Sequence, residues 1–339
     1  MPEGPEVKKI TERISSKVAN TVGKVLIDIV GLDPRYDLRN PKATQVRDDV
    51  GDFQNSILTG RVVVDSIDCH GKFIYWKLTD TKTNEIFTIF HTLGMNGTWR
   101  FSPSESNHHC MEWKFSDGSS IFYRDSRRFG TFKFFKGPSG RDLLEKKISK
   151  ELGPDLLALP SPGIKKFSEA LRKGSRSSWT LPKVLMNQKV IAGIGNYLKA
   201  EILYETRLSP NTKVSELTDA DMENLYHACI KHIHHAYAGK GVLRGPYGIT
   251  SNPAGVTGIN TNVSVTGPFP STPYKFSVYA QRTCPSGHQV IRQQTDDKRT
   301  THWCPNCQGL VEQRLINNAS NKFNSDNSVA FAASTNYCI

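Results

Sequence analysis

Four cysteine and histidine side chains near the C-terminal end of the chain have the spacing of metal ligands. Cys284 and His288 form one short knuckle, Cys304 and Cys307 form a second, and a 15-residue gap separates the two. Thiolates and imidazole suit Zn²⁺, and a closed set of four leaves no position for a reacting water. We therefore predict one structural Zn²⁺ and no organic cofactor. Four unrelated buried residues are the alternative.

Other cysteines and histidines fit metal binding less well. His108, His109 and Cys110 are adjacent, so they do not readily converge on one ion, and we expect an exposed turn there. Four histidines between His227 and His235 fall in a helical stretch, and we expect them on the protein surface.

The N-terminus offers a nucleophile. If Met1 is removed, as is usual before a small residue, Pro2 becomes a terminal secondary amine. An α-amine has a pKa of about 7.7–8, so part of it is neutral near pH 7. Such an amine can attack a sugar C1′ and form an iminium, an electron sink, with Glu3 beside it as acid or base. Many chains begin with Met-Pro, so this pattern alone is weak.

The secondary structure that must position these groups is predicted to be mainly strands in the first half of the chain and mainly helices in the second. One helix is predicted from Pro5 to about Ala19, because apolar residues recur at helical spacing. Short strands separated by turns then favour an antiparallel sandwich or barrel. The predicted strands are 61–67, 72–78, 84–90, 112–115, 120–123 and 131–135.

The second half of the chain is predicted to be mainly helical. We interpret residues 136–163 as a charged, turn-rich linker. Helical spacing follows at 183–186, 197–206 and 219–237, with Thr218 as the N-cap of the last helix. Residues 239–273 have the composition of a long loop, 274–314 that of a Cys/His module, and 316–339 that of a disordered tail.

These patterns predict an α+β multidomain chain. Its predicted parts are a β-sandwich domain with a leading helix (1–140), a helical domain with a loop after about 239 (141–268), a zinc-finger β-hairpin (269–312) and a disordered tail (313–339).

Composition narrows the class of partner. The 339 residues include 44 Lys and Arg against 32 Asp and Glu, a formal net charge of +12. That excess favours a polyanion such as nucleic acid, with a solubilising surface charge as the alternative. The chain has neither a run of about 18 apolar residues nor a signal peptide, so we expect no membrane partner and an intracellular location at DNA, in the nucleus or another DNA compartment.

Several further motifs occur together and in a fixed order. They are the segments 1–7, 70–72, 91–97, 125–130, 152–155, 193–201 and 299–308. In this combination the chain resembles the formamidopyrimidine-DNA glycosylase / endonuclease VIII family over roughly residues 2–310. The Cys-His-Cys-Cys ligand set departs from the four-cysteine finger of the bacterial enzymes and looks more like some endonuclease VIII-like members.

The resemblance implies a fold and roles for individual residues. It implies a β-sandwich, a helix–two-turn–helix domain and a zinc finger, with DNA in the cleft between the two halves. Pro2 matches the nucleophile, Glu3 the acid, and Glu6 and Glu201 supporting carboxylates. Lys72, Asn196 and Arg299 match phosphate-binding positions. Met95, Arg127 and Phe129 match the group of side chains that fills the void left by a flipped base.

The activity implied is that of a monomeric, bifunctional DNA glycosylase and abasic-site lyase of base excision repair. It would remove oxidised bases, oxidised pyrimidines first, from duplex, bubble or single-stranded DNA and cleave the strand by β,δ-elimination. A non-enzymatic zinc-finger DNA-binding protein is one rival, although it leaves the N-terminus unexplained. A nucleotide-binding oxidoreductase is another, but the glycine pattern at Gly193 and Gly195 lacks a third glycine because Leu198 stands there.

Overall fold

The computed structural model describes residues 2–19, 24–103, 108–239, 242–243 and 273–309. The first helix, α1 (Gly4–Val18), begins where the sequence predicts it. Its N-cap is Glu3, whose backbone N–H donates to Glu6 Oε2 at 2.9 Å. This reciprocal capping arrangement satisfies a donor that the helix itself leaves unpaired. The apolar face that the sequence indicated is buried against the sheet and the helical half.

The N-terminal half of the chain is built on one long, folded-over sheet. Within the described residues its strand order is β2-β9-β5-β4-β3-β1-β7-β8-β6, and all neighbours are antiparallel except β2 and β9. The strands are β1 (Leu26–Gly31), β2 (Val46–Asp48), β3 (Val62–His70), β4 (Phe73–Asp80), β5 (Ile86–Thr92), β6 (Thr98–Arg100), β7 (His109–Phe115), β8 (Ser120–Arg124) and β9 (Thr131–Lys136). The six predicted strands are confirmed, whereas β1, β2, β6 and the helix α2 (Val50–Leu58) were not predicted.

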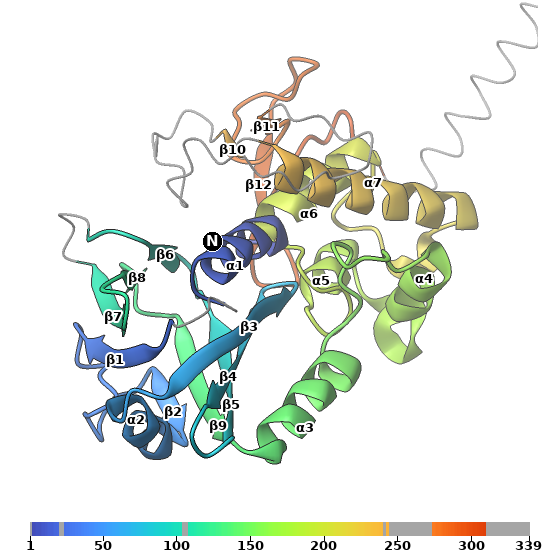
Figure 1. The fold of residues 1–339 in the computed structure, drawn as a ribbon. Coiled ribbons are helices and arrows are strands. Elements are labelled where there is room, and N and C mark those ends of the chain that lie inside the picture. The colour runs from blue at the N-terminus through green and yellow to red at the C-terminus, as the bar shows by residue number, and fades with distance from the viewer. Residues whose placement is uncertain (1, 20–23, 104–107, 240–241, 244–272, 310–339) are drawn as a thin grey trace, which may run out of the picture.

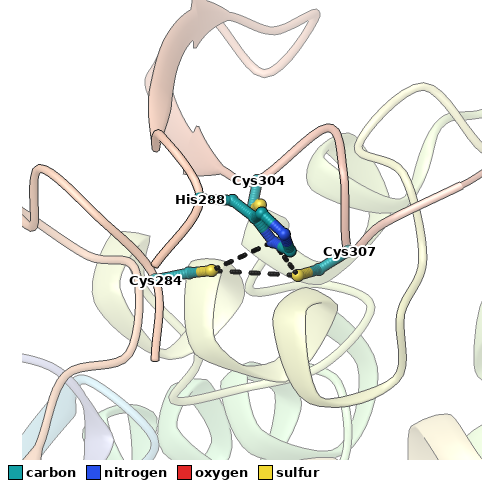
Figure 2. Close-up of side chains that lie close together, drawn as sticks. All are labelled: Cys284, His288, Cys304 and Cys307. Carbon is teal, nitrogen blue, oxygen red and sulfur yellow. Dashed lines mark hydrogen bonds between the residues drawn. The ribbon is translucent and has the colours of Figure 1, made fainter. Parts of the chain in front are cut away.

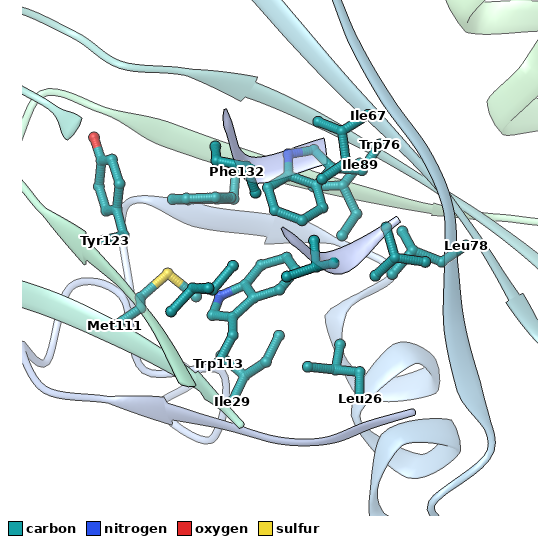
Figure 3. Close-up of a cluster of buried hydrophobic side chains, with 14 of the residues drawn as sticks. Leu26, Ile29, Ile67, Trp76, Leu78, Ile89, Met111, Trp113, Tyr123 and Phe132 are labelled. Atoms are coloured by element: carbon teal, nitrogen blue, oxygen red, sulfur yellow. The ribbon is translucent and has the colours of Figure 1, made fainter. Parts of the chain in front are cut away.

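The sheet folds into a sandwich at the junction of β1 and β3. These two strands pair only at Leu26 and Val62, so the sheet can turn there and place one face on the other. Trp76 of β4 consequently lies 4.6 Å from Trp113 of β7, ring centre to ring centre, although three strand junctions separate them in the sheet. Figure 3 shows these rings in one apolar layer with Phe132. The predicted two-layered β-sandwich is therefore confirmed.

Two predictions for the N-terminal half were wrong. Cys110 is not in an exposed turn but is completely buried in β7, because β7 begins at His109 and its alternation turns the thiol inward. Residues 136–163 are not a plain linker. They contain α3 (Pro138–Lys146) and a π-helical turn at Lys147–Glu151. The large apolar residues of α3, Leu143 and Leu144, are adjacent, so this helix has no apolar residues at helical spacing.

The remaining helices form a second core. They are α4 (Ile164–Arg172), α5 (Leu181–Met186), α6 (Asn196–Glu205) and α7 (Asp219–Ala238). The Thr218 hydroxyl accepts a hydrogen bond from the Asp221 backbone N–H, so the predicted N-cap of α7 is confirmed. The histidines of α7 are not all on the surface: His232 is only 13 % exposed and contacts Tyr274, which packs across this helix.

The C-terminal module is a small β-hairpin that lies over α6 (Figure 1). Its strands are β12 (Ile291–Gln294) and β13 (Thr300–Trp303), which pair antiparallel. A short parallel pair, β10 (Val242–Leu243) and β11 (Tyr274–Lys275), joins it to the end of α7. The predicted long loop, from 244 onward, and the predicted tail lie outside the described residues. Among the helices that the structure describes, none is both long and apolar enough to cross a bilayer.

The backbones of the two halves approach so closely that only glycine fits at the contact. Gly4 N donates to Gly193 O at 2.8 Å, and the Gly71 backbone N–H donates to Asp155 Oδ2 at 2.8 Å. Gly71 has φ +58°, and a Cβ there would lie 2.6 Å from Gly193 N. The turn between β3 and β4 is thereby pressed against the turn that precedes α6.

This contact predicts a difference between two Gly→Ala substitutions. Gly60 has a similar φ of +64°, but a Cβ there would meet no described atom within 4 Å, so Gly60→Ala measures the backbone cost alone, about 1–2 kcal/mol. Gly71→Ala should lower the free energy of unfolding by about 1–3 kcal/mol more, because the methyl group overlaps backbone of the other half. Chemical denaturation of both variants measures the difference, and equal losses would contradict the close contact.

Candidate active site and metal centre

The Glu3 side chain spans the junction between the two halves. Glu3 is 2 % exposed, and its carboxylate accepts hydrogen bonds from two backbone N–H groups in the first turn of α6, Tyr197 N at 2.9 Å and Leu198 N at 3.3 Å. A carboxylate suits this position because a helix N-terminus carries partial positive charge. Gly195 permits the approach, since a Cβ there would lie 2.2 Å from Glu3 Cδ. Pro2, which precedes Glu3, is buried at the same junction.

Glu6 forms a second carboxylate beside Glu3. Its Oε2 accepts from the Glu3 backbone N–H, and its Oε1 accepts from the Tyr197 hydroxyl at 2.8 Å. Tyr197 therefore binds Glu3 through its backbone and Glu6 through its side chain. Sequence reasoning missed Tyr197 as a site residue, although it lies inside the 193–201 motif.

Lys72 reaches the same place from the turn between β3 and β4. Its Nζ donates to the Ile194 carbonyl oxygen at 2.6 Å, next to the turn that holds Glu3. Burial lowers the pKa of Lys72, while the carboxylates of Glu3 and Glu6 raise it again. The ammonium therefore lies near both carboxyl groups, where the two halves meet.

Burial dominates the electrostatics of Glu3. It raises the pKa of Glu3 to about 7, against the opposing attraction of Lys72 and the hydrogen bonds from Tyr197 and Leu198. The nearby Glu6 carboxylate raises it further. Burial also raises the pKa of Glu6, although its hydrogen bonds oppose that shift. A carboxyl group that titrates near neutral pH can both donate and accept a proton under physiological conditions.

Asn196 and Arg299 lie at the contact between α6 and the C-terminal hairpin. Asn196 is the first residue of α6, and its Nδ2 donates to the Thr300 carbonyl oxygen at 2.9 Å. Its Oδ1 is buried and finds no hydrogen-bond partner among the described residues. The Arg299 side chain is exposed in the turn between β12 and β13, close enough to lower the pKa of Lys72 through charge repulsion. The structure therefore gathers Lys72, Asn196 and Arg299 around the N-terminus of α6.

Glu201 also lies on α6 but faces away from Glu3. Its carboxylate accepts from three consecutive backbone N–H groups, Ser277, Val278 and Tyr279, at 2.7, 3.0 and 2.7 Å. These contacts attach the start of the C-terminal module to α6. The geometry gives Glu201 a role in holding this segment rather than in contacting Glu3.

Met95, Arg127 and Phe129 lie on two neighbouring loops at the edge of the sandwich. Asn96 Nδ2 donates to Ser126 Oγ at 3.1 Å, and a Cβ at Gly94 would lie 2.6 Å from the Phe129 carbonyl carbon, so the loops touch. Phe129 is 52 % exposed, and the Arg127 guanidinium lies 5.1 Å from the centre of its ring. An exposed aromatic side chain with a cation above it is available to contact a base.

A buried carboxylate that was not predicted as a site residue shapes the second loop. Asp125 is completely buried and accepts from the backbone N–H groups of Arg127, Phe129 and Gly130 at 3.0, 2.8 and 2.8 Å. It therefore determines how Arg127 and Phe129 project from the sandwich. An acidic residue at the start of a turn-forming segment was the available sequence signal.

The four predicted metal ligands lie together in the C-terminal module (Figure 2). Their ligand atoms are all within 4.8 Å of one another, with Cys284 Sγ 3.8 Å from both Cys307 Sγ and His288 Nδ1. Zn–S bonds of about 2.3 Å would place two sulfur atoms about 3.8 Å apart in a tetrahedron. The donor set and its spacing thus fit Zn²⁺, held by Cys284, His288, Cys304 and Cys307.

Family models match both halves of the chain. The model described as the formamidopyrimidine-DNA glycosylase N-terminal domain matches residues 1–132, and the model described as the H2TH domain of the same family matches residues 152–245. The two matched segments meet at the Glu3 site, since Glu3 and Lys72 come from the first and Tyr197 from the second.

Curated relatives and solved structures agree with that match. The formamidopyrimidine-DNA glycosylase of Bacillus cereus is 26% identical over 317 residues, which cover 92% of this chain and all of the relative. That of Enterococcus faecalis is 27% identical over 324 residues, covering 93% of this chain and all of the relative.

A crystal structure of the Lactococcus lactis enzyme in complex with DNA that contains an abasic site has a similar fold, with a TM-score of 0.68 at 23% identity. It covers 91% of this chain and 99% of the other. Another, in complex with DNA that contains an oxidised pyrimidine, has a TM-score of 0.67 at 24% identity over the same shares of the two chains. The two family models, which match more than half of the sequence, show that the chain belongs to the formamidopyrimidine-DNA glycosylase / endonuclease VIII family.

Proposed function

We propose that this chain is a bifunctional DNA glycosylase and abasic-site lyase that removes oxidised bases, with oxidised pyrimidines as the preferred substrates. The observation that carries the proposal is the junction itself. Pro2, a carboxyl group with a pKa of about 7 and a half-buried ammonium group lie there together, where the two halves meet. A non-enzymatic DNA-binding protein would gain nothing from a titratable acid in that position.

Pro2 is the nucleophile in this proposal. After removal of Met1, its neutral secondary amine attacks C1′ of the damaged nucleotide and the C–N bond to the base breaks, with the base taking up the proton that the amine loses. The C1′–O4′ bond then breaks and leaves an iminium between Pro2 and C1′. Glu3 donates its proton to the sugar ring oxygen as the ring opens, and burial keeps the acid form populated near pH 7. Glu6 holds the Glu3 backbone N–H and so fixes the start of α1.

The same iminium makes strand cleavage possible. It acidifies the C2′ proton, and loss of that proton expels the 3′ phosphate. A second elimination then expels the 5′ phosphate. Lys72, Asn196 and Arg299 bind the phosphates around the damaged nucleotide, because a guanidinium, an ammonium and an amide all offer donors to phosphate oxygens.

Met95, Arg127 and Phe129 fill the space that the flipped nucleotide leaves. A base inside a duplex cannot reach Pro2, so it must leave the stack at a cost of a few kcal/mol. The exposed Phe129 ring suits a wedge, and Arg127 can donate hydrogen bonds to the unpaired base.

Damaged DNA is the proposed partner, and the substrate class rests on two supports. The related Lactococcus lactis enzyme was crystallised with DNA that contains an oxidised pyrimidine. The Cys-His-Cys-Cys ligand set is the feature that favours the endonuclease VIII-like members of the family. One Zn²⁺, with no open coordination position, would hold the hairpin that carries Arg299 and take no part in the reaction.

Blocking the N-terminus tests the nucleophile. A form that retains Met1 or carries an N-terminal tag has no free Pro2 amine, so borohydride should trap no covalent complex with abasic-site DNA. The same protein with the tag at its C-terminus should be trapped as fully as the untagged enzyme. Undiminished trapping of the N-terminally blocked form would overturn the assignment of Pro2.

Replacing the acid tests Glu3. Glu3→Gln should fold normally and lose about 10²–10⁴-fold in the rate of base release, the usual contribution of a positioned proton donor. It should keep part of its cleavage of a preformed abasic site, since no base then has to leave. Glu12→Gln, on the same helix, should leave the rate of base release near that of wild type because Gln retains the acceptor for Tyr237.

The pH dependence follows from the direction of the Glu3 shift. Burial raises its pKa to about 7, so the proton donor is present below that pH and is lost as the pH rises through it. Single-turnover base release should be nearly constant between pH 7 and roughly pH 8, because deprotonation of the Pro2 amine offsets loss of the Glu3 proton. It should fall about tenfold per pH unit above roughly pH 8. The residual rate of Glu3→Gln should show no such decline, and a decline shared by both proteins would point to another group.

Removing the metal tests the zinc assignment. Elemental analysis should find one zinc per chain, and Cys304→Ser should lose it along with DNA affinity, because the hairpin is then no longer held. Trapping through Pro2 at saturating DNA should persist, since the metal lies outside the chemistry. A zinc-free native protein, or Cys304→Ser with unchanged affinity, would contradict the assignment.

A further inference from the structure

We propose that Lys199 and Asp297 form a positioning pair that fixes the turn bearing Arg299 on α6, the helix whose N-terminal N–H groups bind Glu3. This inference rests on the proposed function, because it concerns how Arg299 is presented to a DNA phosphate. Neither residue was singled out in the sequence, and neither belongs to the metal site.

The pair is a buried ion pair between α6 and the hairpin. Lys199 Nζ donates to Asp297 Oδ2 at 2.7 Å, and the two side chains are only 0% and 4% exposed. Lys199 lies three residues after Asn196, so both side chains project from one face of α6. Asn196 holds the Thr300 carbonyl oxygen and Lys199 holds Asp297, which gives the hairpin two attachment points on that face.

The second oxygen of Asp297 organises the turn itself. Asp297 Oδ1 accepts from the Thr295 hydroxyl at 2.6 Å and from the Arg299 backbone N–H at 3.1 Å. Thr295 in turn donates its backbone N–H to the Arg299 carbonyl oxygen at 3.0 Å. One carboxylate therefore joins the backbone of Arg299 to the ammonium of Lys199, and the exposed guanidinium extends from a turn fixed at both ends.

Stability alone gives no reason for this arrangement. Two charges removed from water lose much of their hydration, and an apolar pair of similar size is often as stable or more so. The ion pair does give the turn a defined orientation, because one oxygen of the Asp297 carboxylate binds Lys199 and the other binds the Arg299 backbone N–H. The Arg299 turn is thus held on the same helix whose N-terminus binds Glu3. The phosphate contact and the acid therefore keep a fixed position relative to each other.

The test compares salt dependence of binding rather than stability. The probe is a duplex that carries a tetrahydrofuran abasic-site analogue, which binds but cannot react. Asp297→Asn removes the charge yet keeps an oxygen for the Arg299 N–H, and Lys199→Met removes the ammonium. Each should weaken binding about 10- to 100-fold and lower the slope of log K against log salt by about 0.9, as loss of one phosphate contact does.

A double-variant comparison makes the test specific. If the pair acts through Arg299, then Arg299→Ala should lower the slope in wild type and have no further effect in Lys199→Met. The neutral double variant Lys199→Met/Asp297→Asn keeps no buried unpaired charge, so it separates misfolding from mispositioning: it should bind zinc and melt like wild type but retain the reduced slope. The matched control is Lys231→Met, which breaks the exposed Lys231–Glu205 pair at the other end of α6 and should change nothing.

The outcomes distinguish this inference from the proposed function. If borohydride does not trap the wild-type protein on abasic-site DNA, the proposed function is overturned. A wild-type protein that is trapped, with an unchanged slope in Lys199→Met and Asp297→Asn, overturns the positioning pair alone. Additive slope losses for Lys199→Met and Arg299→Ala would also overturn it, because the two residues would then act independently.

Discussion

The Glu3 carboxylate on the N-terminus of α6 is the contact on which the arrangement of the site depends. It joins the first residues of the chain to a helix almost 200 residues later through two backbone N–H groups. The surroundings are shaped to permit it: Gly195 leaves room for the carboxyl group, and the Gly4 N–H binds the Gly193 carbonyl oxygen beside it. Burial at this contact removes the carboxyl group from water and brings the pKa of Glu3 near neutrality.

Helix α6 is the shared frame for three separate attachments. Its N-terminus receives Glu3, its Asn196 and Lys199 receive the hairpin, and its Glu201 receives the backbone at 277–279. Residues 197–204 are all buried, so α6 meets solvent only at its ends and lies at the centre of these contacts. A displacement of this helix would move the acid, the phosphate contacts and the metal module together.

One of the two loops that we propose contact a base is held in place by a buried carboxylate. Asp125 is buried in the sandwich and binds three backbone N–H groups of the loop that carries Arg127 and Phe129. The side chains that would meet DNA remain exposed, while their backbone is tied to a rigid core. In the proposed function, variation in those side chains would therefore change the contact with DNA without disturbing Glu3.

The sequence by itself determined the local features. Ligand spacing identified the four side chains that cluster as candidate metal ligands, alternation located six strands, and Thr218 marked the start of α7, because each of these depends on residues close together in the chain. The resemblance to a family brought together Glu3, Lys72 and Arg299 as site residues.

Only the tertiary structure decided what joins distant segments. The raised pKa of Glu3 comes from burial by the other half, the Lys199–Asp297 pair links residues almost 100 positions apart, and Cys110 is buried because of the strands around it. α3 escaped prediction since its packing on the sheet, not its own periodicity, supports it. Burial and long-range pairing depend on which distant segments of the chain come into contact. Residue type and local spacing do not specify those contacts directly.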